Sequence, residues 1–195
     1  MHSTSSNTEM YFIAHVLPAE LNDKIELYKQ LMLERYGCKV GLKSPAHITL
    51  IPPFWLATAK EKDLVMDLDL ISMLHFPFII YTNNFASFSP RTIFIDVTGN
   101  KELNALKSSV ESKFTKNKEY NLKVEDRPFK PHITIATRDL TKKSFGEAWA
   151  YFANKKFEKQ WVANSISLLH HNKKNWDVIH TSQFSIDSNQ LIQNL

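Results

Sequence analysis

The sequence repeats two short patterns, and this repetition constrains the fold more than any other feature of the chain. Pro-Ala-His-Ile-Thr-Leu at residues 45–50 is similar to Lys-Pro-His-Ile-Thr-Ile at 130–135, and Tyr-Phe-Ile-Ala-His-Val at 11–16 is similar to Thr-Ile-Phe-Ile-Asp-Val at 92–97. In both halves a helical pattern of apolar residues separates the two segments. Such repetition predicts two similar lobes about an approximate two-fold axis, with equivalent elements facing one shared cleft.

Apolar periodicity and breaker residues predict the order βαβαββ in each half. In the first half we expect strands at 11–16, 46–50, 76–81 and 85–88, a helix between Pro18 and Gly37, and a helix through Leu64, Leu68 and Ile71. In the second half we expect strands at 92–97, 132–136, 164–170 and 176–184, a helix through Leu103, Leu106, Val110 and Phe114, and a helix through Phe145, Trp149 and Phe152. Pro52-Pro53 is expected to end its strand, and Asn83-Asn84 to form a turn.

Composition favours a single globular domain. Hydrophobic residues make up 43% of the 195, enough for a well-buried core, whereas only four glycines and one cysteine, Cys38, are present. The lobes would occupy 11–90 and 91–185, with a flexible tail at 1–10 and a C-terminal tail at 186–195. The segment 1–10 lacks the apolar region of a signal peptide, and no apolar run approaches the roughly 20 residues of a membrane span. We therefore expect a cytoplasmic protein without membrane contact.

The charge balance bears on the partner. Twenty-four basic and twenty acidic residues give a formal net charge of +4. This excess favours a polyanionic partner such as a nucleic acid, whereas solvated helix ends and loops would give the same balance. Charge alone therefore indicates affinity without identifying the ligand.

The two His-Ile-Thr tripeptides carry the chemistry. Side chains two apart on a strand point the same way, so one strand delivers His47 and Thr49 to the cleft. The other delivers His132 and Thr134. One His-x-Thr is usually a packed histidine, but two copies at equivalent positions of a repeat are typical of function. One neutral imidazole could activate water while the other, protonated, supplies the leaving oxygen, and the hydroxyls could bind phosphate oxygens. A bell-shaped pH profile with both limbs near neutrality is expected.

Both motifs, with their flanks at 44–54 and 127–136, resemble those of the two-histidine phosphoesterases, which include 2′-5′ RNA ligase-like proteins and cyclic nucleotide phosphodiesterases. The resemblance covers nearly the whole chain. It implies an α+β bilobal fold with two antiparallel-rich sheets around a central cleft, no metal or other cofactor, and action on 2′,3′-cyclic phosphate or 2′-5′ linked RNA. It further implies that His132 is the base and His47 the acid in hydrolysis, with the roles exchanged in ligation.

Residues beside the motifs are candidates for substrate contact. Many relatives place an arginine directly after the alanine that follows the second motif, whereas this sequence has Thr137 there and Arg138 one position later. Arg138, like Arg127 and Lys130, could contact phosphate or only solvate the surface. Two aromatic residues after the first motif could stack a base or pack in the core, and for the first of them packing is preferred; these are Phe54 and Trp55.

Other patterns are set aside. His170-His171 and His180 lack a cysteine or carboxylate at ligand spacing, so no metal site is predicted. No Gly-rich phosphate loop is present, which disfavours a nucleotide-dependent ligase or kinase. The sequence thus predicts a monomeric metal-independent phosphoesterase whose partners are RNA ends or small nucleotides. The alternatives are an RNA-end-binding module without useful catalysis, and 2′-5′ RNA ligation in the reverse direction.

Overall fold

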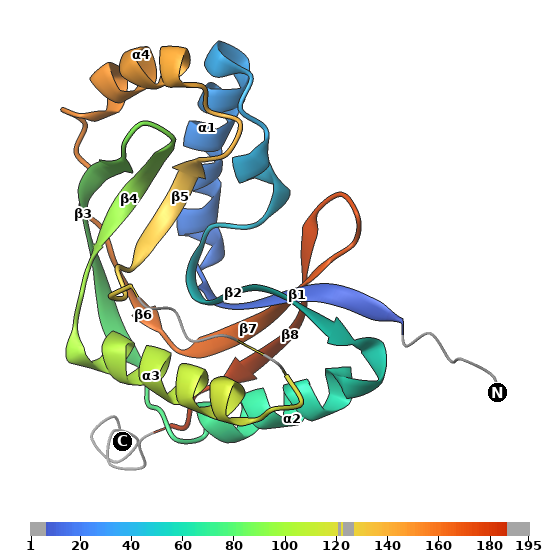
Figure 1. The fold of residues 1–195 in the computed structure, drawn as a ribbon. Coiled ribbons are helices and arrows are strands. Elements are labelled where there is room, and N and C mark those ends of the chain that lie inside the picture. The colour runs from blue at the N-terminus through green and yellow to red at the C-terminus, as the bar shows by residue number, and fades with distance from the viewer. Residues whose placement is uncertain (1–6, 121, 123–126, 187–195) are drawn as a thin grey trace.

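The computed structural model describes residues 7–120, 122 and 127–186, which form eight strands, four α-helices and two short 3-10 helices (Figure 1). The predicted tails therefore fall mostly outside the described residues. The elements are β1 (Thr8–Val16), α1 (Ala19–Tyr36), η1 (Val40–Lys43), β2 (His47–Ala57), η2 (Thr58–Lys60), α2 (Glu61–Ser72), β3 (Phe78–Phe88), β4 (Thr92–Thr98), α3 (Lys101–Lys116), β5 (His132–Ala136), α4 (Lys142–Phe152), β6 (Gln160–Ala163), β7 (Ser165–His171) and β8 (Trp176–Gln183).

The strands form two four-stranded antiparallel sheets, which confirms the predicted α+β class. The first sheet has the order β2-β1-β7-β8 and the second the order β5-β4-β3-β6. The C-terminal hairpin β7-β8 therefore joins the sheet of the N-terminal strands, while β3 pairs with β4 and β6 in the other sheet. The expected lobes at 11–90 and 91–185 do not coincide with these sheets, because β7 and not β3 occupies the free edge of β1.

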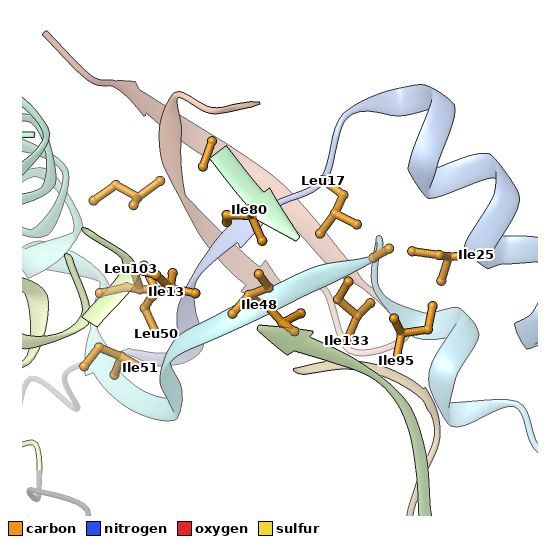
Figure 2. Close-up of a cluster of buried hydrophobic side chains, with 14 of the residues drawn as sticks. Ile13, Leu17, Ile25, Ile48, Leu50, Ile51, Ile80, Ile95, Leu103 and Ile133 are labelled. Carbon is orange, nitrogen blue, oxygen red and sulfur yellow. The ribbon is translucent and has the colours of Figure 1, made fainter. Parts of the chain in front are cut away.

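The core lies between the sheets and under the helices, and alternate residues of the two motif strands enter it. Ile48 on β2 and Ile133 on β5 are fully buried, whereas the histidines and threonines beside them are half-buried. Figure 2 shows Ile48 and Ile133 together with Ile95 and Ile25 in this cluster. As predicted, strand alternation directs the histidine and the threonine of each tripeptide to the face opposite the buried isoleucine.

A buried histidine joins the two sheets. The Nδ1 of His15 on β1 donates to the carbonyl oxygen of Ser165 on β7 at 2.9 Å, and its Nε2 accepts from the indole N–H of Trp161 on β6 at 2.8 Å. Both ring nitrogens thus have partners that suit a neutral imidazole, and burial lowers the pKa of His15. This side chain has a structural role in fixing β6 against the first sheet.

Three local features differ from expectation. β1 begins at Thr8, inside the segment expected to be a tail. β2 continues past Pro52-Pro53. Among the described residues it is an edge strand paired only with β1, and both prolines are exposed, so no ladder bond to a second described strand is lost. Asn83-Asn84 does not form a turn: β3 runs through it with a bulge, and Asn84 adopts φ 61, a conformation that asparagine tolerates. The expected strands 76–81 and 85–88 are therefore one.

Candidate active site

The two motif strands lie at the ends of their sheets and contact each other across the molecule. Two cavities open along this contact. The first, the His47 cavity, has a volume of about 340 Å³ and is lined by His47, Thr49 and Thr134 together with residues from β1, η1 and β8. The second, the His132 cavity, is lined by His132 and again by Thr49. The four residues of the two motifs thus line two adjoining cavities that share Thr49, and we call the two cavities together the cleft.

Both imidazoles are held in the same tautomer by the same local contact. His47 Nδ1 lies 2.8 Å from the carbonyl oxygen of Pro45, and His132 Nδ1 lies 2.8 Å from that of Lys130. A carbonyl only accepts hydrogen bonds, so Nδ1 carries the hydrogen in each ring. Each neutral imidazole therefore keeps a lone pair on Nε2, on the side of the ring away from the backbone.

His47 lies in an apolar and cationic setting. Its ring centroid is 4.8 Å from that of Phe12, and behind its strand the ammonium of Lys29 donates to the carbonyl oxygen of Ser44 at 2.8 Å. Lys29 is only 2% exposed, and burial lowers its pKa to about 8. Burial lowers the pKa of His47 to about 4, and the charges of Lys29 and His132 act in the same direction against the hydrogen bond to Pro45. His47 is therefore neutral at pH 7 without substrate.

His132 has a more balanced charge environment. Its ring packs against Phe94 of β4 at 5.0 Å and edge-on to Phe88 of β3 at 5.2 Å. Burial lowers the pKa of His132, the ammonium of Lys130 lowers it further, and the carboxylate of Asp96 raises it. Lys130 Nζ lies 3.7 Å from Asp96 Oδ1. The two histidines thus share a tautomer and differ in their charged neighbours, which are Lys29 for His47 and both Lys130 and Asp96 for His132.

The 3-10 helix η1, which precedes the first motif, is fixed against the strand of the second. Asp139, just after β5, accepts hydrogen bonds from the backbone N–H groups of Lys39 at 2.7 Å and Val40 at 2.9 Å. At Gly41 the backbones approach so closely that a Cβ would overlap the carbonyl oxygen of Ile135. The absence of a side chain at Gly41 therefore lets η1 seat on β5. This contact holds η1, which leads into the first motif, against the strand of the second motif.

The flanking candidates occupy different places. Arg138 is exposed, has φ 56 and lines the His47 cavity, whereas Arg127 and Lys130 line the His132 cavity. Phe54 is 7% exposed and packs on Tyr11 in the core, so the stacking role considered for it does not fit the structure. Trp55 is 63% exposed but lines neither cavity.

Several residues at the cleft were not singled out from the sequence. Phe12 and Trp176 line the His47 cavity, and Lys107 lines the His132 cavity; His171, set aside from the sequence as a metal ligand, also lines the His47 cavity. The three aromatic residues come from β1, β7 and β8, which only the observed sheet order brings together. Two lysines could have been recognised from the sequence, because each occupies a position in the apolar stripe of its helix. Lys107 lies between Leu103 and Val110, and Lys29 lies between Ile25 and Met32.

Other reactive side chains lie away from this chemistry. Cys38 is buried, and burial raises the pKa of its thiol to about 11, which disfavours a nucleophilic thiolate. His180 pairs with Asp69 at 2.8 Å on the far end of β8. Among the described residues, no group of three or more His, Cys, Asp or Glu side chains is arranged to hold a metal ion. Within the same residues, no helix is long and apolar enough to cross a membrane.

The sequence matches the family model described as the 2′-5′ RNA ligase superfamily over residues 17–175, a span that includes both His-Ile-Thr tripeptides. The chain belongs to this superfamily, which confirms the resemblance found in the two motifs. No curated protein matches the chain in sequence.

Solved structures with the same fold give a closer comparison. E. coli LigT complexed with 3′-AMP superposes with a TM-score of 0.64 at 17% identity, covering 92% of this chain and 99% of that one. TT0787 of Thermus thermophilus superposes with a TM-score of 0.61 at 18% identity, covering 90% of this chain and 97% of that one. E. coli LigT has also been solved with NADP+, with a TM-score of 0.64, 17% identity and coverage of 92% and 99%. At these identities the likeness establishes the fold.

Proposed function

We propose that this protein is a metal-independent phosphoesterase that opens 2′,3′-cyclic phosphates, or cleaves 2′-5′ phosphodiesters, of RNA or nucleotides. One observation carries the proposal: two imidazoles, each with Nδ1 bonded to its own backbone and Nε2 left without a backbone partner, line two adjoining cavities together with two threonines. The family supports a phosphoester substrate. The LigT complexes with 3′-AMP, NADP+ and ATP support a nucleotide in particular.

The proposed hydrolysis needs one proton acceptor and one proton donor. The Nε2 of His132 takes a proton from water while the water oxygen bonds to phosphorus. The bond from phosphorus to one ribose oxygen breaks, and that oxygen receives a proton from Nε2 of His47. Thr49 and Thr134 donate hydrogen bonds to the non-bridging oxygens, where negative charge increases in the transition state. The product is a phosphomonoester, and proton exchange with solvent restores both histidines. Ligation would be the reverse of these steps on a 2′-5′ phosphodiester: a ribose hydroxyl bonds to phosphorus, His47 takes its proton, and the oxygen that leaves phosphorus receives a proton from His132 and departs as water.

In the proposed mechanism the phosphate of the substrate must favour protonation of His47, which is neutral in the free protein. His47 has to be protonated to act as the acid, yet burial and Lys29 keep it neutral. A phosphate anion in the cleft favours the imidazolium and should raise the pKa of His47 by roughly one to three units. Both lowered pKa values also move the expected pH profile of the free enzyme below neutrality. This displacement of the pH profile toward acidic pH should be larger for kcat/KM, which reports the free enzyme, than for kcat, which reports the substrate complex.

An NMR titration of labelled histidine with and without inorganic phosphate measures this shift directly. We expect the His47 resonance to titrate near pH 4 in the free protein and at clearly higher pH with phosphate. His75, whose pKa is lowered by burial and which lines neither cavity, is the internal control, and phosphate should leave its pKa unchanged. A rise confined to His132 would contradict the assigned roles and make His47 the base.

A substrate screen tests the activity itself. Cyclic mononucleotides, 2′-5′ dinucleotides and RNA with a 2′,3′-cyclic end are incubated with protein treated with a chelator, which removes free divalent metal. We expect phosphomonoester products, at rates that the chelator leaves unchanged. Strong inhibition by the chelator would contradict the metal-free mechanism. Tight binding of the cyclic-ended RNA without product over a long incubation would instead support the alternative, an RNA-end-binding module.

A further inference from the structure

Two polar side chains of α1 hold the residues that lead into the first motif. The ammonium of Lys29 donates to the carbonyl oxygen of Ser44 at 2.8 Å, and the side-chain oxygen of Asn22 accepts from the backbone N–H of Ala46 at 2.6 Å. Asn22 and Lys29 are two turns apart, so both lie on one face of the helix. Ile25, between them on that face, is fully buried in the core (Figure 2). The core thus fixes the face of α1 from which both bonds are made.

The residues held in this way, 44–46, carry the acceptor that orients His47, and we call them the entry segment. The carbonyl oxygen of Pro45, the middle residue, is bonded to Nδ1 of His47 at 2.8 Å. The ring of Pro45 restricts its own φ. Ala46 is bonded on both sides, because its carbonyl oxygen also accepts from the N–H of Leu17 at 3.0 Å. The Pro45 carbonyl therefore has little freedom to turn away from the imidazole.

The burial of Lys29 indicates that its ammonium is needed where it lies. The residue is 2% exposed, and its Nζ is 3.9 Å from the carboxylate of Glu26 but only 2.8 Å from the carbonyl oxygen of Ser44. Its stem passes beneath η1, where a Cβ on Gly41 would lie 3.7 Å from its Cγ. A buried charge is costly, and an apolar side chain of similar volume often packs at least as well. The carbonyl that the ammonium holds gives a reason for the charge.

The second motif differs from the first in the residue before its histidine. At the position of Ala46 it has Pro131, which has no N–H to satisfy and whose ring restricts the backbone directly before His132. Apart from the bond made by His132 itself, no side chain hydrogen-bonds the backbone of 129–131 in the described part of the chain. The orientation of His132 is thus supported by the proline ring, whereas that of His47 depends on α1.

We infer that Asn22 and Lys29 are positioning residues of the reaction. By holding the entry segment they keep the Pro45 carbonyl on Nδ1 of His47, and so keep Nε2 of this ring away from the backbone and available for proton transfer. Neither side chain lines a cavity of the cleft. The inference rests on the proposed function, in which this Nε2 gives a proton to the leaving oxygen. A displacement of about 1 Å in such a group can cost roughly 10²-fold in rate.

Nitrogen NMR of labelled histidine at pH 7 tests the inference without turnover. In the wild-type protein His47 should show one neutral tautomer, with the hydrogen on Nδ1. Asn22→Ala removes an acceptor without changing charge, so part of the His47 signal should move to the Nε2–H tautomer while the His132 signal stays unchanged. Lys29→Met replaces the ammonium by an apolar side chain of similar length and should act in the same direction. Asn22→Asp keeps the acceptor oxygen and should retain the wild-type tautomer.

Steady-state kinetics on the best substrate of the screen tests the consequence for the reaction. Asn22→Ala and Lys29→Met should each lower kcat by roughly 10- to 100-fold with little change in KM, because a displaced acid weakens the transition state and not substrate binding. Asn100→Ala is the matched control. It removes an acceptor of the same kind, bonded to the N–H of Leu103 at 2.7 Å, at the start of α3 and outside both cavities. This variant should lose stability to a similar extent and keep the wild-type kcat and His47 tautomer.

The outcomes separate this inference from the function on which it rests. An unchanged tautomer and kcat in Asn22→Ala and Lys29→Met would overturn the inference and leave the phosphoesterase function standing. An equal fall of kcat in Asn100→Ala would also overturn it, because a general loss of stability would then explain the result. If the wild-type protein turns over no substrate, the proposed function fails and the tautomer still decides. A change confined to His47 then supports the positioning role, whereas no change, or an equal change at His132, contradicts it.

Discussion

Alanine at His47 or at His132 should lower kcat by roughly 10²- to 10⁴-fold, the usual contribution of one general acid or base. Each substitution removes the only proton-transferring group on its strand, and the remaining imidazole cannot serve both ends of the reaction at once. The double variant should be little worse than the weaker single variant, because the two groups act as a unit. Steady-state rates on the best substrate of the screen measure all three.

The histidine variants must remain folded for this result to be informative. Both imidazoles are half-buried and lie on the cleft face, while the core contacts come from Ile48 and Ile133. We therefore expect melting temperatures close to that of the wild-type protein. His180→Ala removes a histidine outside the cleft and is the matched control for turnover. Full activity of either cleft variant, with a wild-type melting curve, would refute the paired-histidine mechanism.

Gly41→Ala should destabilise the protein by about 3 kcal/mol, in the range of overpacked sites. The added methyl group would overlap the carbonyl oxygen of Ile135, which belongs to the β5 backbone and has little freedom to move. For a chain of this size the change corresponds to a fall of roughly 10 °C in melting temperature. Calorimetry or thermal circular dichroism measures it. Since η1 leads into the first motif, kcat/KM should fall as well.

Gly146→Ala supplies a control of the opposite sign. Gly146 lies in the exposed middle of α4, and a Cβ there would meet nothing within 4 Å. Alanine in a helix interior is more stable than glycine by roughly 0.5–1 kcal/mol, so this variant should melt slightly higher than wild type. A Gly41→Ala protein as stable as Gly146→Ala would show that η1 does not seat on β5 as described.

Local patterns in the sequence were sufficient to predict most elements and the four motif residues. The helix expected between Pro18 and Gly37 is α1, which ends where Gly37 adopts φ 70. The burial of Ile48 and Ile133 follows from strand alternation, which depends only on neighbours along the chain. These features involve residues close in sequence, so their signals are readable without knowledge of the fold.

Features set by distant partners were not predictable in this way. Whether Pro52-Pro53 ends a strand depends on how many neighbouring strands β2 has, and in the described part of the chain it has one. The strand β6 has only four residues, too short a pattern to stand out. Asn84 lies within the bulge of β3, where its side chain accepts a hydrogen bond from the N–H of the distant Phe157 at 2.9 Å. Trp176 reaches the cleft only because β7 pairs with β1. Pairing between the two ends of a chain has no local signature.

The same pairing has a consequence for the synthesis of the protein. Tyr11 on β1 lies opposite His170 on β7, so one side of β1 has no partner until nearly all of the described chain has been made. During synthesis on the ribosome, the edge of β1 that later pairs with β7 would stay unpaired, and an unpaired strand edge favours association with other chains. A chain ending before residue 165 would keep both His-Ile-Thr tripeptides and yet lack the strand beside β1 and the ring of Trp176. The site is thus completed by the last hairpin to emerge.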